Sequence, residues 1–199
     1  MIRASRNRGF LNFVVCAVLL AASHIAAAAS MDPVIAAYHK MENGHFRTEA
    51  MITDDKGKVT NSKAEFETME RIHVTSPRSE IIMLPEGTWM RTGDKWMKPP
   101  VDMSALVKSF RPMGEDMLRA ATNVTDNGTT TWQGQPAHSY TYDTDTTVMG
   151  IHASAHTTVY LSAAGTVLGS ESDSEAMGRK SHTVQKVIYD EAVRVHAPG

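Results

Sequence analysis

The sequence predicts a mainly β protein (α+β): a curved antiparallel sheet that forms an incomplete β-barrel, with helices covering its concave face. Segments in which apolar and polar residues alternate recur along most of the chain, and turn sequences rich in Gly, Pro, Asn and Asp separate them. Two stretches of helical spacing, at residues 32–44 and 102–121, interrupt these segments without starting parallel crossovers. About ten strands joined by short turns are typical of one strongly curved sheet or partial barrel.

Residues 1–29 are predicted to be a signal peptide, and residues 30–199 a single folded domain. Three arginines precede an apolar stretch at residues 10–22, and the small residues at 26–30 suit a cleavage site after Ala29, although a cut one residue earlier fits equally well. The alternative for this stretch is a transmembrane anchor, but the run is rich in alanine and interrupted by polar residues. The single cysteine lies within it, so we expect a mature protein without a disulfide, exported to the periplasm.

Composition argues against two classes of function. Without the three leader arginines, 17 basic and 22 acidic side chains remain, and this acidic balance argues against a nucleic-acid partner. The chain has no Gly-x-Ser-x-Gly elbow, no cysteine beyond the leader and no phosphate-binding loop. We therefore expect neither an enzyme nor a cofactor.

The first half of the mature chain reads as a helix followed by a meander of strands. Asp32 is predicted to cap a helix that has proline at its first position and ends at an Asn-Gly pair. Period-two alternation then predicts strands at residues 45–53, 63–76 and 79–84. Consecutive strands with short turns are expected to pair with one another as an antiparallel meander.

A β-hairpin is predicted around a Gly-Asp turn at residues 93–94. In this register Met90 faces Met97, and the two share one face of the hairpin. Trp89, Trp96 and Lys98 then lie on the other face, where an indole can stack on a cation. So much apolar and aromatic surface on two short strands needs a covering neighbour or a ligand.

Helical spacing predicts a short helix over residues 102–110 and another turn or two over 114–121. An Asn-Gly pair at 127–128 predicts a hairpin between residues 122–126 and 129–133. The remaining alternating segments complete the sheet, at residues 137–143, 151–161, 166–174 and 179–189.

Three segments resemble the exported LolA/LolB-type lipoprotein-carrier superfamily and its LppX/LprG-like relatives. They are the hairpin at residues 93–99, the strand turn at 132–140 (Trp-Gln-Gly-Gln-Pro-Ala-His-Ser-Tyr) and the strand-turn-strand at 157–168. The resemblance implies an incomplete antiparallel barrel whose apolar inside, covered by helices, takes up acyl chains. It implies binding and transport rather than catalysis.

The predicted function is a periplasmic binding or carrier protein, expected to be a monomer. Its expected partner is a hydrophobic small molecule or a lipoprotein acyl chain, which a membrane-associated acceptor could receive. Acyl chains are held by buried apolar area, at about 0.8 kcal/mol per methylene, so no sharp polar motif is expected. The candidate cleft residues are Trp89, Met90, Trp96, Met97, Met103, Leu106, Phe110, Met113 and Met117.

Two alternatives stay open. A copper- or zinc-binding protein could use its histidines and methionines, with His152 and His156 as the first candidates. On a strand, however, these two side chains would lie about 13 Å apart, too far to share one ion. The second alternative is an envelope sensor or protein-binding module without lipid cargo.

Overall fold

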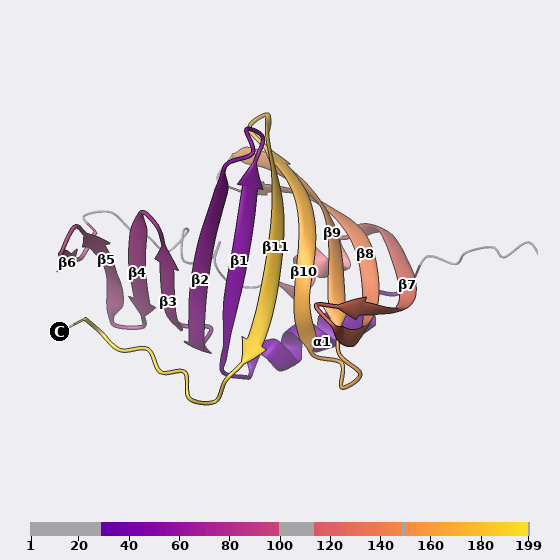
Figure 1. Ribbon diagram of the computed structural model, residues 1–199, viewed down its shortest axis with the longest axis horizontal. Helices are drawn as coiled ribbons and strands as arrows, with labels where there is room; N and C mark the ends of the chain where they lie inside the picture. The colour runs from indigo at the N-terminus through magenta and orange to yellow at the C-terminus, as the bar shows by residue number, and fades with distance from the viewer. Residues whose placement is uncertain (1–28, 100–113, 149, 199) are drawn as a thin grey trace, which may run out of the picture.

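Eleven antiparallel strands form one sheet in the computed structural model, which describes residues 29–99, 114–148 and 150–198 (Figure 1). The strand order is β6-β5-β4-β3-β2-β1-β11-β10-β9-β8-β7, so two meanders meet where β1 pairs with β11. The strands are β1 (Phe46–Asp54), β2 (Val59–Thr68), β3 (Arg71–Ser76), β4 (Ser79–Leu84), β5 (Gly87–Thr92), β6 (Lys95–Met97), β7 (Thr122–Trp132), β8 (Gln135–Val148), β9 (Ile151–Leu161), β10 (Val167–Ala176) and β11 (Arg179–Tyr189). Because β6 and β7 are its two edges, the sheet is open, and the predicted incomplete barrel is confirmed.

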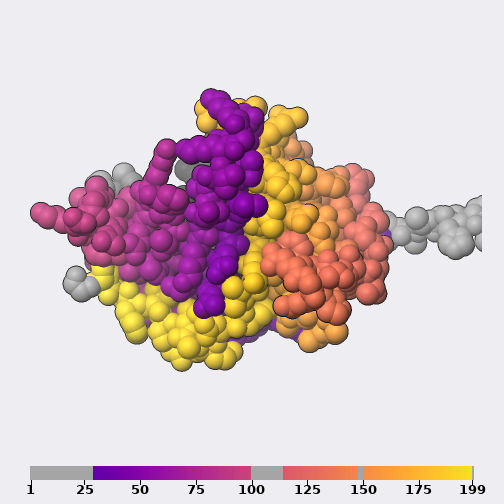
Figure 2. Space-filling view, in the orientation of Figure 1, coloured from indigo at the N-terminus to yellow at the C-terminus, as the bar shows by residue number. Residues whose placement is uncertain are grey.

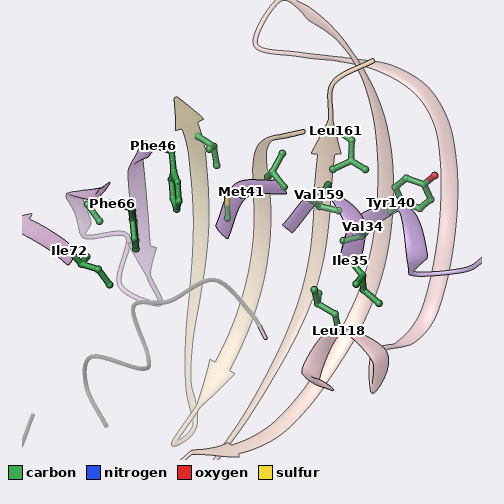
Figure 3. Close-up of a cluster of buried hydrophobic side chains, with 14 of the residues drawn as sticks. Val34, Ile35, Met41, Phe46, Phe66, Ile72, Leu118, Tyr140, Val159 and Leu161 are labelled. Atoms are coloured by element: carbon green, nitrogen blue, oxygen red, sulfur yellow. The ribbon is translucent and has the colours of Figure 1, made fainter. Parts of the chain in front are cut away.

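Helix α1 (Asp32–Glu42) lies mainly against β9 and β10, and the sheet curves around it (Figure 3). Its apolar stripe faces the sheet, and the buried members are Val34, Ile35, Ala37 and Met41. The predicted cap is one residue off, because Met31 occupies the N-cap position and Asp32 lies in the first turn. There the carboxylate still complements the positive end of the helix dipole. Among the described helices, none is long and apolar enough to cross a membrane.

A large apolar cluster, here called the inner core, fills the space between α1 and the sheet (Figure 3). Phe46 on β1 is fully buried and stacks on Phe66 of β2, with ring centroids 4.4 Å apart. From the other half of the sheet Tyr142 and Val159 are also fully buried. The inner core therefore joins both meanders to the helix.

One predicted strand is wrong: residues 63–76 form a hairpin of β2 and β3 rather than a single strand. The chain reverses at Met69 and Glu70, where the Glu70 amide donates to the Thr68 hydroxyl at 3.2 Å. The reversal contains neither glycine nor proline, and the alternation of apolar residues continues on both sides of it. Turns are predicted from residues such as glycine, proline and asparagine, and because this turn has none of them the two strands read as one.

The hairpin predicted at the Asn-Gly pair is also wrong, because β7 runs through it without reversing. The register of β7 against β8 shifts between Asp126 and Gly128, which marks a β-bulge. Gly128 has φ +75°, which glycine adopts without strain, and its amide donates to the Asp126 carboxylate at 2.8 Å. The Asn-Gly chemistry is thus used to accommodate an extra residue rather than to close a turn.

The central hairpin has the predicted register, with Met90 opposite Met97 and Arg91 opposite Trp96. Gly93, in the turn, has φ +61°, as a tight hairpin turn requires. Lys98 lies over the Trp89 ring, 5.0 Å from its centroid, on the face predicted for both side chains.

A second, smaller cluster lies on the opposite face of the sheet and is called the outer cluster. It consists of Ile82, Leu84, Val193 and Val195, with Trp89 and Trp96 packed against it. The two valines belong to residues 190–198, the segment after β11, which returns across the outer face of the first meander. Figure 2 shows this segment in yellow against the indigo and magenta strands.

Candidate ligand-binding site

The inner face of the first meander carries apolar side chains from three neighbouring strands. Because side chains alternate along a strand, β3, β4 and β5 each turn every second residue to this face. The set, here called the wing surface, is Ile72, Val74, Ile81, Met83 and Met90. Val74 pairs with Ile81, and Ile81 pairs with Met90, so the side chains form a continuous row across the strands.

Met90 lies at the border of the inner core. It is half-buried and packs against that core, whereas its partner Met97 is 50% exposed near the end of β6. Met69, at the β2–β3 turn, is a second half-buried methionine at the same border. Methionine is flexible and polarizable, so this border can adapt to ligands of imprecise shape.

The structure separates the predicted tryptophans from the predicted methionines. Trp89 and Trp96 pack in the outer cluster, on the face opposite to Met90. A strand gives alternate residues to opposite faces, so Trp89 and Met90 cannot line the same cleft. The predicted cleft residues therefore lie on two faces: Met90 belongs to the wing surface, and Trp89 and Trp96 belong to the outer cluster.

Helix α3 (Glu115–Arg119) carries one of the predicted cleft residues, Met117, which is half-buried. The neighbouring Leu118, which the helical spacing places with Met117 but which is not among the predicted cleft residues, is 1% exposed and belongs to the inner core. Ile81 and Met83 were also missed, although the apolar run of β4 could have indicated them. Four further candidates lie outside the described residues: Met103, Leu106, Phe110 and Met113.

Two open cavities lie elsewhere on the described part of the molecule. One, of about 690 Å³, is lined by residues of β8, β9, β10 and β11 and by the end of β1, and includes the Asp143–His156 pair, whose closest atoms are 2.6 Å apart. Hydrogen bonds from Asn123 and His156 hold the pKa of Asp143 below its usual range. The other, of about 780 Å³, is lined by Met51, Val184 and their polar neighbours. None of the predicted cleft residues lines either cavity.

The two histidines of the metal alternative both lie on β9, as the strand prediction required. Each pairs with an aspartate of β8: His152 with Asp145 at 2.9 Å, and His156 with Asp143 at 2.6 Å. Within the described ranges, no group of three or more His, Cys, Asp or Glu side chains is placed to hold an ion. The two histidines therefore form separate cross-strand pairs with aspartates.

A charged network crosses the outer face beside the central hairpin. Arg91 donates to Glu80 at 2.9 Å, and the other carboxylate oxygen of Glu80 lies 2.9 Å from His73 Nε2. His73 Nδ1 in turn lies 3.2 Å from Glu65. The Arg91 guanidinium, followed by the His73 ring, holds the pKa of Glu80 below its usual range. The network connects β2, β3, β4 and β5.

Replacing Glu80 with glutamine is expected to lower the thermal midpoint at pH 7 by at most about 2–4 °C, because a partly exposed ion pair contributes less than about 1 kcal/mol. A carboxyl whose pKa is lowered on folding stabilises the native state above its unfolded value of about 4.3. That contribution is lost as the pH falls through the lower folded pKa. The midpoint of the variant should therefore decline less than that of the wild type between about pH 5 and 3.

Thermal unfolding followed by circular dichroism across this pH range measures the difference. Glu70→Gln is the matched control, because Glu70 is exposed in the β2–β3 turn. Parallel pH profiles for Glu80→Gln and the wild type would contradict the assignment.

The arrangement defines a class of protein: an open antiparallel half-barrel that curves around a helix and has an apolar inner face. No protein-family model and no curated protein sequence matches the chain. Among solved structures it is similar to LprF from Mycobacterium bovis, with a TM-score of 0.53 and 11% identity, over 87% of this chain and 99% of that one. This likeness shows the fold, and it confirms the resemblance predicted from the sequence at that level.

Two further solved structures match with lower TM-scores. The lipoprotein LppX from Mycobacterium tuberculosis has a TM-score of 0.47 and 13% identity, over 83% of this chain and 100% of that one. A LolA superfamily protein from Nitrosomonas europaea has a TM-score of 0.36 and 7% identity, over 86% and 96%.

Proposed function

We propose that the protein is a periplasmic carrier that binds a lipid, a lipoprotein acyl chain or another hydrophobic molecule against the wing surface. The observation that supports this site is the continuous apolar row across β3, β4 and β5, bordered by the half-buried Met69 and Met90. Binding of an acyl chain needs apolar area rather than a polar pattern, and the row supplies it.

The half-buried methionines at its border favour the wing over the space under α1. There Val34, Phe46 and Tyr142 are fully buried, so the protein's own side chains fill the volume. A close-packed core leaves no room for a guest. Four of the five wing residues are buried as well, but the half-buried Met69 and Met90 at their border are flexible and can move aside for a ligand.

The other parts of the proposal follow from the leader and the composition. Residues 1–29 would direct export and be removed, and the remaining domain would act as a periplasmic monomer. It would deliver its cargo to a membrane-associated acceptor, with no chemical step and no cofactor. The likeness to LprF supports the fold of such a carrier, while the cargo follows from the wing surface alone.

Replacing Met90 with lysine is expected to weaken the uptake of a fluorescent fatty acid at least tenfold. The long side chain keeps its charge near water at this half-buried border, so the fold should survive. A cation there would nevertheless oppose an alkyl chain entering the row. Fluorescence titration of the purified mature domain measures the change, and native mass spectrometry of the protein from its own periplasm shows whether a hydrophobic ligand co-purifies.

Met51→Lys is the matched control, because Met51 is 44% exposed and lines the outer cavity of about 780 Å³. Uptake should be unchanged in this variant. Absence of any ligand or uptake in the wild type would contradict the carrier function. Weaker uptake in Met51→Lys, but not in Met90→Lys, would move the site to the outer face.

A further inference from the structure

After a turn in which the Val193 amide donates to the Asp190 carbonyl at 3.1 Å, the segment that follows β11 lies on the outer face with alternating burial. Val193 is 8% exposed and Val195 2% exposed, while Ala192, Arg194 and His196 are exposed. This period of two is that of a β-strand, yet the segment is not a strand of the sheet. Two valines spaced two residues apart thus insert into the outer face like the anchors of a bound peptide.

Side chains of the sheet hold the backbone of this segment. The amide of Val195 donates to the Glu67 carboxylate at 2.9 Å, and Arg71 donates to the Val195 carbonyl at 3.3 Å. That amide also lowers the pKa of Glu67. Both main-chain groups of Val195 are therefore satisfied by one acidic and one basic side chain, which would accept any extended backbone placed there.

The surface beneath the valines is aromatic and aliphatic. Ile82 and Leu84 of β4 are each 7% exposed, and Trp89 and Trp96 pack against them. Tryptophan supplies a large contact area for little loss of conformational entropy, which is why it dominates the energetics of many recognition surfaces. We call this surface, with Glu67 and Arg71, the tryptophan groove.

We propose that the tryptophan groove is a binding site for an extended peptide with β-branched residues two positions apart. The chain's own residues 190–198 occupy it in cis, and a segment of the same pattern from a partner protein can replace them. The segment is outside the strand ladder, so its departure breaks no strand pairing. This inference is independent of the proposed carrier function, because the groove and the wing surface lie on opposite faces.

A variant that ends after Glu191 tests the proposal. It keeps Asp190, whose ion pair with Arg47 at 3.0 Å lies outside the groove, and removes both valines. A synthetic peptide of residues 190–199 is then added, with tryptophan fluorescence as the readout. Trp89 and Trp96 report on the groove, whereas Trp132 stacks on Tyr160 elsewhere and gives a constant background.

The peptide is expected to bind the shortened variant and to shift the tryptophan emission to shorter wavelength. A control peptide with both valines replaced by aspartate should bind at least tenfold more weakly. The full-length protein should bind the peptide at least tenfold more weakly than the variant, because its groove is filled. Equal binding of the two peptides, or no binding by the folded variant, would overturn the proposal. So would loss of the far-ultraviolet dichroism of the sheet, since the segment would then be an inseparable part of the fold.

Discussion

Replacing Phe46 with alanine is expected to lower the free energy of unfolding by about 3–5 kcal/mol, the usual cost of truncating a buried aromatic side chain. Phe46 is fully buried and stacks on Phe66 with an interplanar angle of 12°. It also lies on β1, whose pairing with β11 joins the two meanders. The cavity left by the ring would therefore weaken the contact between the two halves of the sheet.

Equilibrium unfolding in urea measures this change. Met51→Ala is the matched control on the same strand, since Met51 is 44% exposed and its truncation should stay within about 0.5 kcal/mol. A loss below about 1 kcal/mol for Phe46→Ala would mean that the core can collapse around the missing ring, and that the junction does not depend on it.

Replacing Gly169 with alanine is expected to cost about 3 kcal/mol or more, because the added Cβ has no space. It would lie 2.8 Å from Cζ2 and 2.9 Å from Nε1 of Trp132, and still closer to the main-chain oxygen of Gln185. A backbone oxygen in a paired strand cannot move aside as a flexible side chain can. The glycine therefore permits the Trp132 ring to lie against β10 and stack on Tyr160, with centroids 4.2 Å apart.

Thermal unfolding, together with near-ultraviolet dichroism from the Trp132–Tyr160 stack, measures the effect. Gly44→Ala is the control, because an added Cβ there would meet no atom closer than 3.7 Å, which is ordinary van der Waals contact. That variant should unfold within about 0.5 kcal/mol of the wild type. Similar stabilities for the two variants would show that the outer face tolerates a shift of β10 or of Trp132.

Strand β4 connects the two proposed sites. Ile81 and Met83 belong to the wing surface, while Ile82 and Leu84 form the floor of the tryptophan groove. A continuous apolar run is typical of a strand buried on both faces. Such a run does not indicate what covers each face, because that cover comes from distant parts of the chain.

The central hairpin shows which features local chemistry could predict. Its turn, its register and the stacking of Lys98 on Trp89 all depend on residues within a dozen positions of one another. The Asn-Gly pair shows the limit of such signals. Gly128 has the positive φ of a turn residue, but pairing of β7 with β8 on both sides turns it into a bulge.

The amino-acid sequence by itself determined the alternation of the strands, the stripe of α1, the open antiparallel class and the central hairpin. These depend on side-chain period and turn chemistry, which act over a few residues. Only the tertiary structure decided which neighbours Met90 and Trp89 have on their opposite faces of the sheet. It also decided that Val193 and Val195 pack with the tryptophans. The physical reason is that burial of apolar area has no direction, so an apolar residue does not specify which distant segment will cover it.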